Sequence, residues 1–387
     1  MIKLYETQSY RKENQTIVTG CFREKKGIFV TLEESIFFPE EGGQYADTGW
    51  IVYGENRVRL TDGQIRNGEV FYRVESEIPE GTEVLCTIDW EPRYMRMQQH
   101  TGEHILTGTI HRHFGFNNVG FHLSDDAPVT LDLDGVLTVE QAMKMETLAN
   151  QIIYQNLPVE DSYPSKEELT AIDYRSKIAI EGQVRLITVP GVDICACCAP
   201  HVARTGEVGL IKIVSMQNYK GGIRLNILCG MRALMHYREQ LQLMSSLANS
   251  LSTRPEQVAG IVSSQKEELL MLRHQVSQMA ETALLKEIDS LQNGTNACVF
   301  AAGDTSAVAV KNAFNAMAKK FGGYVGVFAG DDENGYRYNA GSGSLDSRVL
   351  AGLMREKLAA KGGGSKEMVQ GKTQAKRAMI ETFFAEL

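Results

Sequence analysis

Short apolar segments separated by turn residues fill the first 90 positions of the chain. Six of them are rich in β-branched and aromatic residues, and Gly, Asn and Pro separate them: IVTGCF, GIFVTL, GWIVYG, RVRLTDG, GEVFYRV and EVLCTID. Many short strands with frequent turns are typical of a small barrel or sandwich. The pattern therefore predicts a β-barrel domain over residues 1–90.

A helical spacing replaces this pattern after Trp90. Apolar residues at three- and four-residue intervals predict a long helix over residues 93–114 and two further helices over 138–155 and 165–171. Three strand-like segments follow: VRLITV, GLIKIVS and IRLNIL. Helices packed on a mostly antiparallel sheet would make residues 91–229 an α+β domain.

The segment 230–292 has a helical pattern throughout, interrupted at Pro255. Thr253 and Glu256 have the spacing of a capping box for its second half. Apolar residues of that half keep the three–four spacing of a coiled-coil seam: Leu269, Leu272, Val276, Met279, Ala283 and Leu291. We therefore expect a helical linker, and a homodimer formed through this linker and the C-terminal domain.

Residues 293–387 alternate strand-like and helical segments and contain a glycine-rich stretch, residues 362–365, that is expected to be a turn. This alternation predicts a C-terminal α/β domain. The whole chain is thus expected to be an α+β multidomain protein.

The composition is that of an ordinary globular protein, because 43% of the 387 residues are hydrophobic and 23% are charged. No run approaches the roughly 18 apolar residues that a membrane span needs, so we expect no membrane partner. The first residues lack the apolar core of a signal peptide. Seven cysteines, three of them crowded at positions 195–198, favour metal or redox chemistry in the cytoplasm over a disulfide framework.

The net charge of −8 is unevenly distributed along the chain. Residues 1–292 hold 28 Lys and Arg against 39 Asp and Glu, whereas residues 293–387 hold 12 against 9. Phosphate binding needs a local surplus of cations. The acidic part cannot hold RNA by its overall charge, but the C-terminal part could.

Two histidines lie four residues apart in the sequence HTGEH on the predicted long helix. This spacing puts the rings of His100 and His104 on one face, close enough for both to bind one ion at about 2.0–2.1 Å. A metalloprotease helix would carry Glu directly after the first His, where this chain has Thr101. By itself the pair fits two unrelated surface histidines equally well.

A second pair with the same offset, Cys197 and His201, lies in the sequence CACCAPH, which is expected to be a loop or strand edge. Together the two pairs offer three imidazoles and one thiolate, a tetrahedral set that suits zinc. The alternative is that Cys195 and Cys198 form a redox pair, or that the cysteines are inert buried thiols.

Two glycine-rich segments complete the candidate chemistry. In PEEGGQYADTG, Gly42 and Gly43 predict an unusual backbone turn beside Gln44, although a simple loop is the plainer interpretation. In AAKGGGSKEMVQGK, backbone N–H groups and lysines could bind phosphates. The candidate phosphate-binding residues there are Lys361, Gly362, Gly363, Gly364, Lys366 and Lys372. The alternative is a helix C-cap followed by a solvated basic helix.

These four segments, in this order, resemble motifs of the alanyl-tRNA synthetase family. PEEGGQYADTG, HTGEHIL and CCAPHVARTGEVGLIKI resemble elements of its editing domain, and GGGSKEMVQGK resembles the end of its C-terminal, DHHA-type domain. The catalytic and tRNA-recognition regions of the synthetase are absent. The chain therefore resembles the free-standing AlaX-type alanyl-tRNA editing proteins in their long form.

The resemblance implies one zinc ion per chain, bound by His100, His104, Cys197 and His201. It also implies a pocket containing Gln44 and Ser35, the latter where many relatives carry a threonine that recognises the serine hydroxyl. Glu103 is a candidate proton shuttle, with an exposed helix carboxylate as the alternative. The extra thiols Cys195 and Cys198 leave open which sulfur binds the metal.

The implied reaction is ATP-independent hydrolysis of the ester in tRNA(Ala) mischarged with serine or glycine. An alanine pocket cannot exclude glycine and rejects an added hydroxyl only about a hundredfold, so a second, hydrolytic site is needed. The main alternative is a non-catalytic RNA-binding module with a structural zinc. A DHH phosphoesterase is disfavoured, because no Asp-His-His string occurs in the chain.

Overall fold

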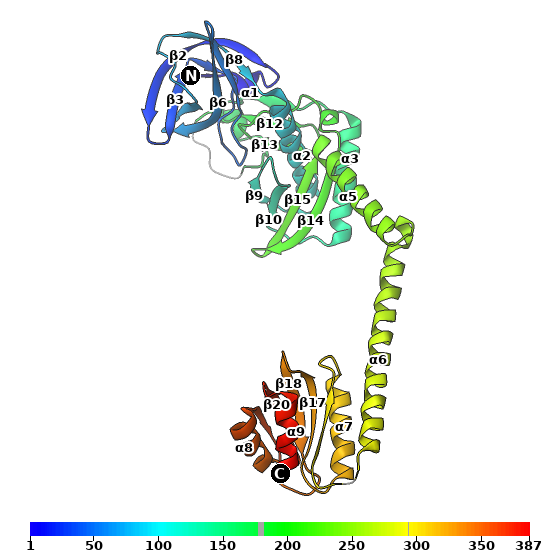
Figure 1. The fold of residues 1–387 in the computed structure, drawn as a ribbon. Coiled ribbons are helices and arrows are strands. Elements are labelled where there is room, and N and C mark those ends of the chain that lie inside the picture. Colours follow the sequence, from blue (N-terminus) through cyan, green and yellow to red (C-terminus); the bar gives the residue numbers. More distant parts are fainter. Residues whose placement is uncertain (177–181, 293) are drawn as a thin grey trace. The chain divides into compact units, whose positions relative to one another are not determined.

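The computed structural model describes residues 1–387 except 177–181 and 293. The chain forms two compact units, Met1–Met244 and Ser245–Leu387 (Figure 1). None of the described helices combines the length and the apolar character that crossing a membrane requires.

The N-terminal part is a closed six-stranded barrel, as predicted. All six expected segments are strands, hydrogen-bonded in the order β2-β3-β7-β6-β5-β8. Their bounds are β2 (Glu13–Glu24), β3 (Gly27–Leu32), β5 (Gly49–Tyr53), β6 (Asn56–Arg66), β7 (Glu69–Val74) and β8 (Glu83–Ile88). Side chains alternate between a buried and an exposed face along β2: Val18 is buried in the barrel core, whereas Ile17 and Phe22 are exposed.

Short elements pack against this barrel through Leu4, which belongs to its core. β1 (Ile2–Lys3) pairs in parallel with β4 (Glu34–Ser35), and α1 (Leu4–Thr7) follows β1 directly. The loop between β4 and β5 carries Gly42, Gly43 and Gln44, and it leaves the barrel toward the next module.

One long, buried helix organises the module that follows. α2 (Trp90–Phe114) begins three residues earlier than predicted, because Pro92 is accommodated in its first turn, where no backbone N–H is needed. α3 (Val139–Gln155) begins at a capping box between Thr138 and Gln141, and α4 (Lys166–Leu169) is a single turn.

Two antiparallel sheets accompany these helices. The larger has the order β14-β15-β10-β9 and the smaller β11-β12-β13. Their bounds are β9 (Asn118–His122), β10 (Val129–Leu133), β11 (Glu160–Ser162), β12 (Leu186–Val189), β13 (Asp193–Ala196), β14 (Ile211–Tyr219) and β15 (Gly222–Cys229). The α+β prediction is correct, although β9, β10, β11 and β13 were not expected.

The segment after β15 is helical as predicted, but the break near Pro255 is built differently from the predicted capping box. α5 (Gly230–Ser250) is followed by a short 3-10 turn, η2 (Pro255–Gln257), and by α6 (Val258–Ser290). The predicted capping box is wrong: the Thr253 hydroxyl donates to the Gln257 side chain at 3.0 Å, and no side chain caps η2 or α6.

α6 combines an exposed stripe with a buried end. Leu269, Leu272, Val276 and Met279 are all about half exposed or more. Near its C-terminus the helix instead buries Leu284 and Ile288 in the core of the second unit. The predicted domain start at Asn293 lies outside the described residues.

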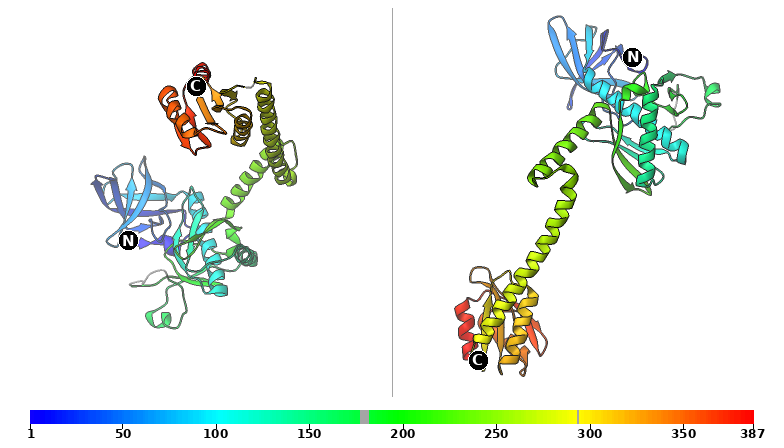
Figure 2. Two further views of the ribbon diagram at one scale, coloured as in Figure 1. Left: turned by 90° about the horizontal axis from the view of Figure 1, so that it is seen from below. Right: turned by 90° about the vertical axis from the view of Figure 1, so that its right-hand side faces the viewer.

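The second unit is built on a five-stranded sheet of order β16-β17-β18-β20-β19. Only β16 and β17 run parallel. The elements are β16 (Ala297–Ala301), α7 (Ala307–Lys320), β17 (Val325–Asp331), β18 (Gly335–Gly341), α8 (Ser347–Leu358), β19 (Lys361–Gly364), β20 (Met368–Thr373) and α9 (Arg377–Glu386). Val327 faces α6 and α7, whereas Phe328 faces α8 and α9, so helices cover both faces of the sheet (Figure 2).

The predicted glycine-rich turn is wrong. Residues 361–364 form the edge strand β19, which pairs antiparallel with β20. A Cβ at Gly362 or Gly364 would lie 2.2 Å from a carbonyl oxygen of β20, whereas one at Gly363 would meet nothing within 4 Å. The close approach of the two strands therefore explains two of the three glycines.

Candidate metal centre

The two histidines of HTGEH lie on the buried side of α2. His100 and His104 are each 3% exposed, and their ring centroids are 5.4 Å apart. Because α2 is buried along most of its length, His100 and His104 are not two unrelated surface histidines.

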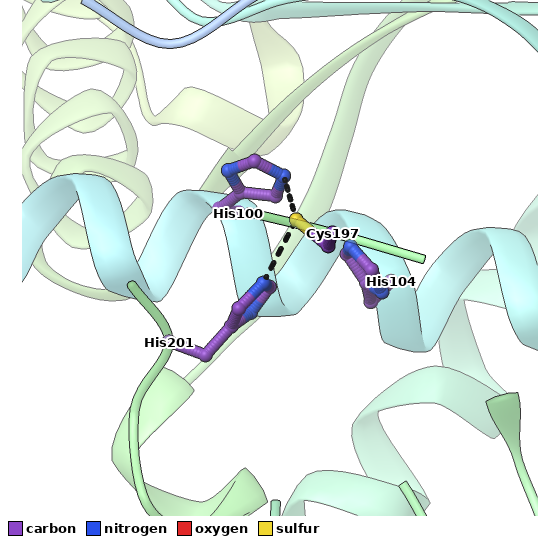
Figure 3. Close-up of side chains that lie close together, drawn as sticks. All are labelled: His100, His104, Cys197 and His201. Atoms are coloured by element: carbon purple, nitrogen blue, oxygen red, sulfur yellow. Dashed lines mark hydrogen bonds between the residues drawn. The ribbon is translucent and has the colours of Figure 1, made fainter. Parts of the chain in front are cut away.

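The segment after β13 brings the other two residues to the same place. Cys197 Sγ lies 3.5 Å from His100 Nε2 and 3.4 Å from His201 Nε2. The ligand atoms of four residues all lie within 4.8 Å of one another, and we name these residues the quartet: His100, His104, Cys197 and His201 (Figure 3). Residues almost a hundred positions apart thus meet around one sulfur.

Each histidine of the quartet has a polar partner at its outer nitrogen. The Nδ1 atom of His100 lies 2.8 Å from Gln44 Oε1, and that of His104 lies 3.1 Å from Asp193 Oδ2. His201 Nδ1 lies 3.0 Å from the Thr101 hydroxyl. A proton on Nδ1 leaves each Nε2 lone pair facing the shared space, which is the arrangement of metal-binding histidines.

The electrostatics favour the metal-binding protonation states of Cys197 and His201. For His104, burial alone would lower the pKa, but the charge of Cys195 and the hydrogen bonds of Asp193 and Cys197 raise it well above its usual value. Burial alone would raise the pKa of Cys197, but the charges and hydrogen bonds of the neighbouring histidines outweigh it and hold that pKa well below its usual value. Burial lowers the pKa of His201 to about 3. A thiolate beside a neutral imidazole is what a metal ion needs.

The donor set therefore fits zinc. Three imidazoles and a thiolate form the soft, nitrogen-rich set that zinc prefers, and every histidine has the outer partner that orients it. Exposed acidic clusters often imitate such sites, but these four residues are buried or half-buried.

The geometry distinguishes the three neighbouring thiols. Only the Cys197 sulfur joins the three histidines. Cys195 lies with His104 and Asp193, and burial raises the pKa of its thiol to about 11. Cys198 lies near Glu41 and Gly42, and burial together with the charge of Cys197 raises its pKa. All seven cysteines are free.

The glycine pair at the barrel loop has the unusual backbone that its sequence predicts. Gly42 and Gly43 have φ angles of +61° and +85°, and a Cβ at Gly43 would lie 2.5 Å from the Phe121 carbonyl oxygen. The Leu123 amide donates to the Gly43 carbonyl at 2.8 Å. The loop thereby places the buried Gln44 against His100, and the Gln44 Nε2 atom has no partner among the described residues.

The two other predicted site residues occupy different surroundings. Ser35 is buried in the barrel, where its hydroxyl accepts from the Phe37 amide at 3.1 Å, and it makes no hydrogen bond to the quartet within the described parts of the chain. Glu103 is 2% exposed, so the exposed-carboxylate alternative is wrong. It accepts from Asn118 Nδ2, and its Oε2 lies 3.9 Å from His104 Nε2.

The basic residues of the second unit meet across strands. Lys361 of β19 lies opposite Lys372 of β20, and Lys372 lies opposite Arg337 of β18. Directly paired residues share a face of the sheet. We name these three residues the cationic row; Arg337 was missed because it is distant in sequence. None of the three forms a salt bridge with a described carboxylate, and Lys366 is exposed in the β19–β20 turn.

Sequence comparisons agree with this architecture. The family of class II (A) tRNA synthetases matches residues 6–92, and the threonyl and alanyl tRNA synthetase second additional domain matches residues 184–226. The alanyl-tRNA editing protein AlaX-L of Pyrococcus horikoshii is 28% identical over 97% of this chain and 95% of its own length.

This chain resembles the long form of the AlaX-type alanyl-tRNA editing proteins. The alanine–tRNA ligase of Ignicoccus hospitalis is 29% identical over 71% of the chain, and that of Pyrobaculum neutrophilum 28% over 89%. The regions matched in those two ligases are 31% and 40% of their lengths. The region matched in the AlaX-L protein is 95% of its length. The resemblance indicated by the four motifs is confirmed.

Proposed function

We propose that the protein is a trans-editing hydrolase that removes serine from mischarged Ser-tRNA(Ala), and glycine from Gly-tRNA(Ala). The quartet carries this proposal, because it is a preformed zinc-type site in a chain that resembles an alanyl-tRNA editing protein throughout. A synthetase pocket that fits alanine also accepts serine and glycine, so the mischarged tRNA must be hydrolysed at a second site.

The quartet would hold one zinc ion. A bound zinc supplies a Lewis acid that polarises an ester carbonyl or lowers the pKa of a water molecule. Gln44 fixes His100 through Oε1 and keeps a buried N–H donor for the carbonyl or hydroxyl of the aminoacyl group. A buried donor without a partner costs about 1–3 kcal/mol, which an acceptor on the substrate would offset.

Ser35 and Glu103 are assigned roles in binding the serine hydroxyl and in proton transfer. The Ser35 oxygen accepts one N–H and has a second lone pair for a serine hydroxyl, but the side chain is fully buried, so this role requires the surrounding barrel residues to move. The 3.9 Å between Glu103 and His104 supports a role for Glu103 in holding a proton near the reacting ester.

The competing function is a non-catalytic RNA-binding module with a structural metal. Four protein donors favour it, since structural zinc sites are closed and catalytic ones keep a position open. Hydrolysis by the folded, zinc-loaded protein would exclude this alternative.

We propose that tRNA(Ala) also contacts the second unit through Lys361, Gly362, Gly363, Gly364, Lys366 and Lys372. Like charges directly opposite each other are unfavourable within a sheet, and a phosphate between them would relieve the repulsion. This substrate implies a cytoplasmic protein.

We further propose a homodimer in which the exposed stripe of α6 pairs with that of a second copy. The heptad-like spacing and exposure of Leu272 and Met279 support it. Light scattering should give about twice the chain mass, and Met279→Glu should reduce it to the monomer. A monomeric wild-type protein would refute the dimer.

The decisive experiment compares deacylation of Ser-, Gly- and Ala-tRNA(Ala) by the zinc-loaded protein. We expect rapid loss of serine or glycine and retention of alanine. The folded His104→Ala protein should be inactive, and normal hydrolysis by it would contradict the assigned site.

A further inference from the structure

A second cluster of metal-ligand side chains adjoins the quartet. Atoms of His104, Asp193 and Cys195 all lie within 4.8 Å of one another, and all three residues are buried. His104 belongs to both groups and uses its outer nitrogen toward Asp193. The cluster is therefore either a second cation site or a support for the first.

Arg175 decides between these two interpretations. Its guanidinium binds both carboxylate oxygens of Asp193, with Nε 2.7 Å from Oδ1 and a terminal nitrogen 2.8 Å from Oδ2. The Thr107 hydroxyl accepts a further hydrogen bond from the guanidinium at 2.9 Å. A fixed positive charge on the only carboxylate of the cluster repels a metal ion, which excludes the second cation site.

The backbone is shaped to bring this ion pair under the helix. Gly108 of α2 lies over Asp193, and a Cβ there would come within 2.6 Å of the Asp193 Cβ and 2.9 Å of the Val192 carbonyl oxygen. Asp193 begins β13, and the Arg175 amide donates to the Ile194 carbonyl at 2.8 Å. Because Gly108 has no side chain, β13 can approach α2, the helix that carries His100 and His104.

The three outer partners of the quartet differ in charge. His100 is held by the Gln44 amide and His201 by the Thr101 hydroxyl, both neutral, whereas His104 is held by a carboxylate. A carboxylate makes an imidazole more basic and fixes its tautomer more strongly than a neutral partner does. His104 is then the histidine with the most firmly determined orientation.

We propose that Arg175 and Asp193 are positioning residues that set the metal affinity of the quartet through His104. This inference rests on the metal role of the quartet but not on the hydrolytic reaction. Arg175 aligns both oxygens of Asp193, and Asp193 aligns the imidazole so that its inner nitrogen faces the metal position.

The test is metal affinity, measured on the full chain by competition with a chromophoric chelator. Asp193→Asn should weaken zinc binding by about 10–100-fold, the usual effect of losing an outer partner. Arg175→Lys keeps the charge but loses the two-pronged contact, so it should weaken binding less. With cobalt(II), both variants should change the visible absorption bands, which report ligand geometry.

A matched control is available in the same unit. Arg224 binds both oxygens of Asp132 at 2.6 and 2.7 Å, and neither residue has a hydrogen bond or ion pair with the quartet among the described contacts. Asp132→Asn should leave zinc affinity and the cobalt spectrum unchanged. If Asp193→Asn folds and binds zinc as tightly as wild type, or if wild type binds no zinc, the inference is wrong.

The outcome separates this inference from the proposed reaction. Weakened zinc binding by Asp193→Asn, in a protein that hydrolyses no aminoacyl-tRNA, would support the positioning pair and refute the editing activity. Should Asp193→Asn fail to fold, Arg175→Lys provides the same two measurements.

Discussion

The quartet and the cationic row are built in opposite ways. The quartet has three buried histidines and a half-buried cysteine, comes from two distant segments, and has a hydrogen-bond partner at each outer histidine nitrogen. The cationic row lies on one face of neighbouring strands near a sheet edge, and it has no carboxylate partner among the described residues. A fixed ion demands exact ligand geometry, whereas a polyanion is attracted over a distance and tolerates variation in the position of charges.

The largest effect should follow removal of the quartet sulfur. Cys197→Ala deletes the thiolate donor, so zinc affinity should fall by more than about 100-fold and deacylation should be lost. Zinc content per chain and the deacylation rate measure this. Cys198→Ala removes the adjacent thiol outside the quartet and should retain both properties; equal losses in the two variants would contradict the choice of sulfur.

Removing the metal with a chelator should lower the stability of the first unit and leave that of the second unit unchanged. Both tryptophans, Trp50 and Trp90, lie in the first unit, so their fluorescence reports on that unit alone. A ligand at 100 times its Kd stabilises the folded state by about 2.7 kcal/mol, which corresponds to about 5–11 °C for a unit of this size. The chelator should lower the midpoint temperature of the tryptophan-monitored transition by that amount. An unchanged midpoint would show that no metal stabilises this unit.

The glycines of β19 allow a matched pair of substitutions. Gly362→Ala would place a Cβ 2.2 Å from the Gln370 carbonyl and should destabilise the second unit by about 1–3 kcal/mol. Gly363→Ala meets open space and should change stability by less than about 0.5 kcal/mol. Urea unfolding followed by circular dichroism measures both; weaker tRNA binding by stable Gly363→Ala would assign that glycine to RNA.

The smallest effects are expected at individual cations. Neutralising Lys361, Lys372 or Arg337 to Gln should weaken tRNA binding a few-fold and reduce the salt-dependence slope by about one per residue. Titrations at several salt concentrations give this slope. Lys286→Gln, on exposed helix α6, serves as the control, and a slope that stays constant in all three row variants would remove the row from the RNA interface.

The sequence predicted the barrel and the quartet because both depend on local spacing. Strand-like segments alternate locally, and His100 with His104, like Cys197 with His201, repeat a four-residue offset. Asp193 and Arg175 carry no such signal, since their contact arises only when β13 packs against α2. The error at Gly362 has the same origin: three glycines favour a turn locally, but pairing with β20 makes them a strand.

The sequence distances within the centre determine when it can be completed. Gln44 and His100 are 56 residues apart, and His100 and Cys197 are 97 apart. During synthesis at about 5–20 residues per second, the two helix histidines leave the ribosome roughly 5–20 s before the sulfur does. The nascent chain therefore passes through a period in which only two of the four quartet side chains have emerged, and the quartet is complete only once β13 has docked on α2.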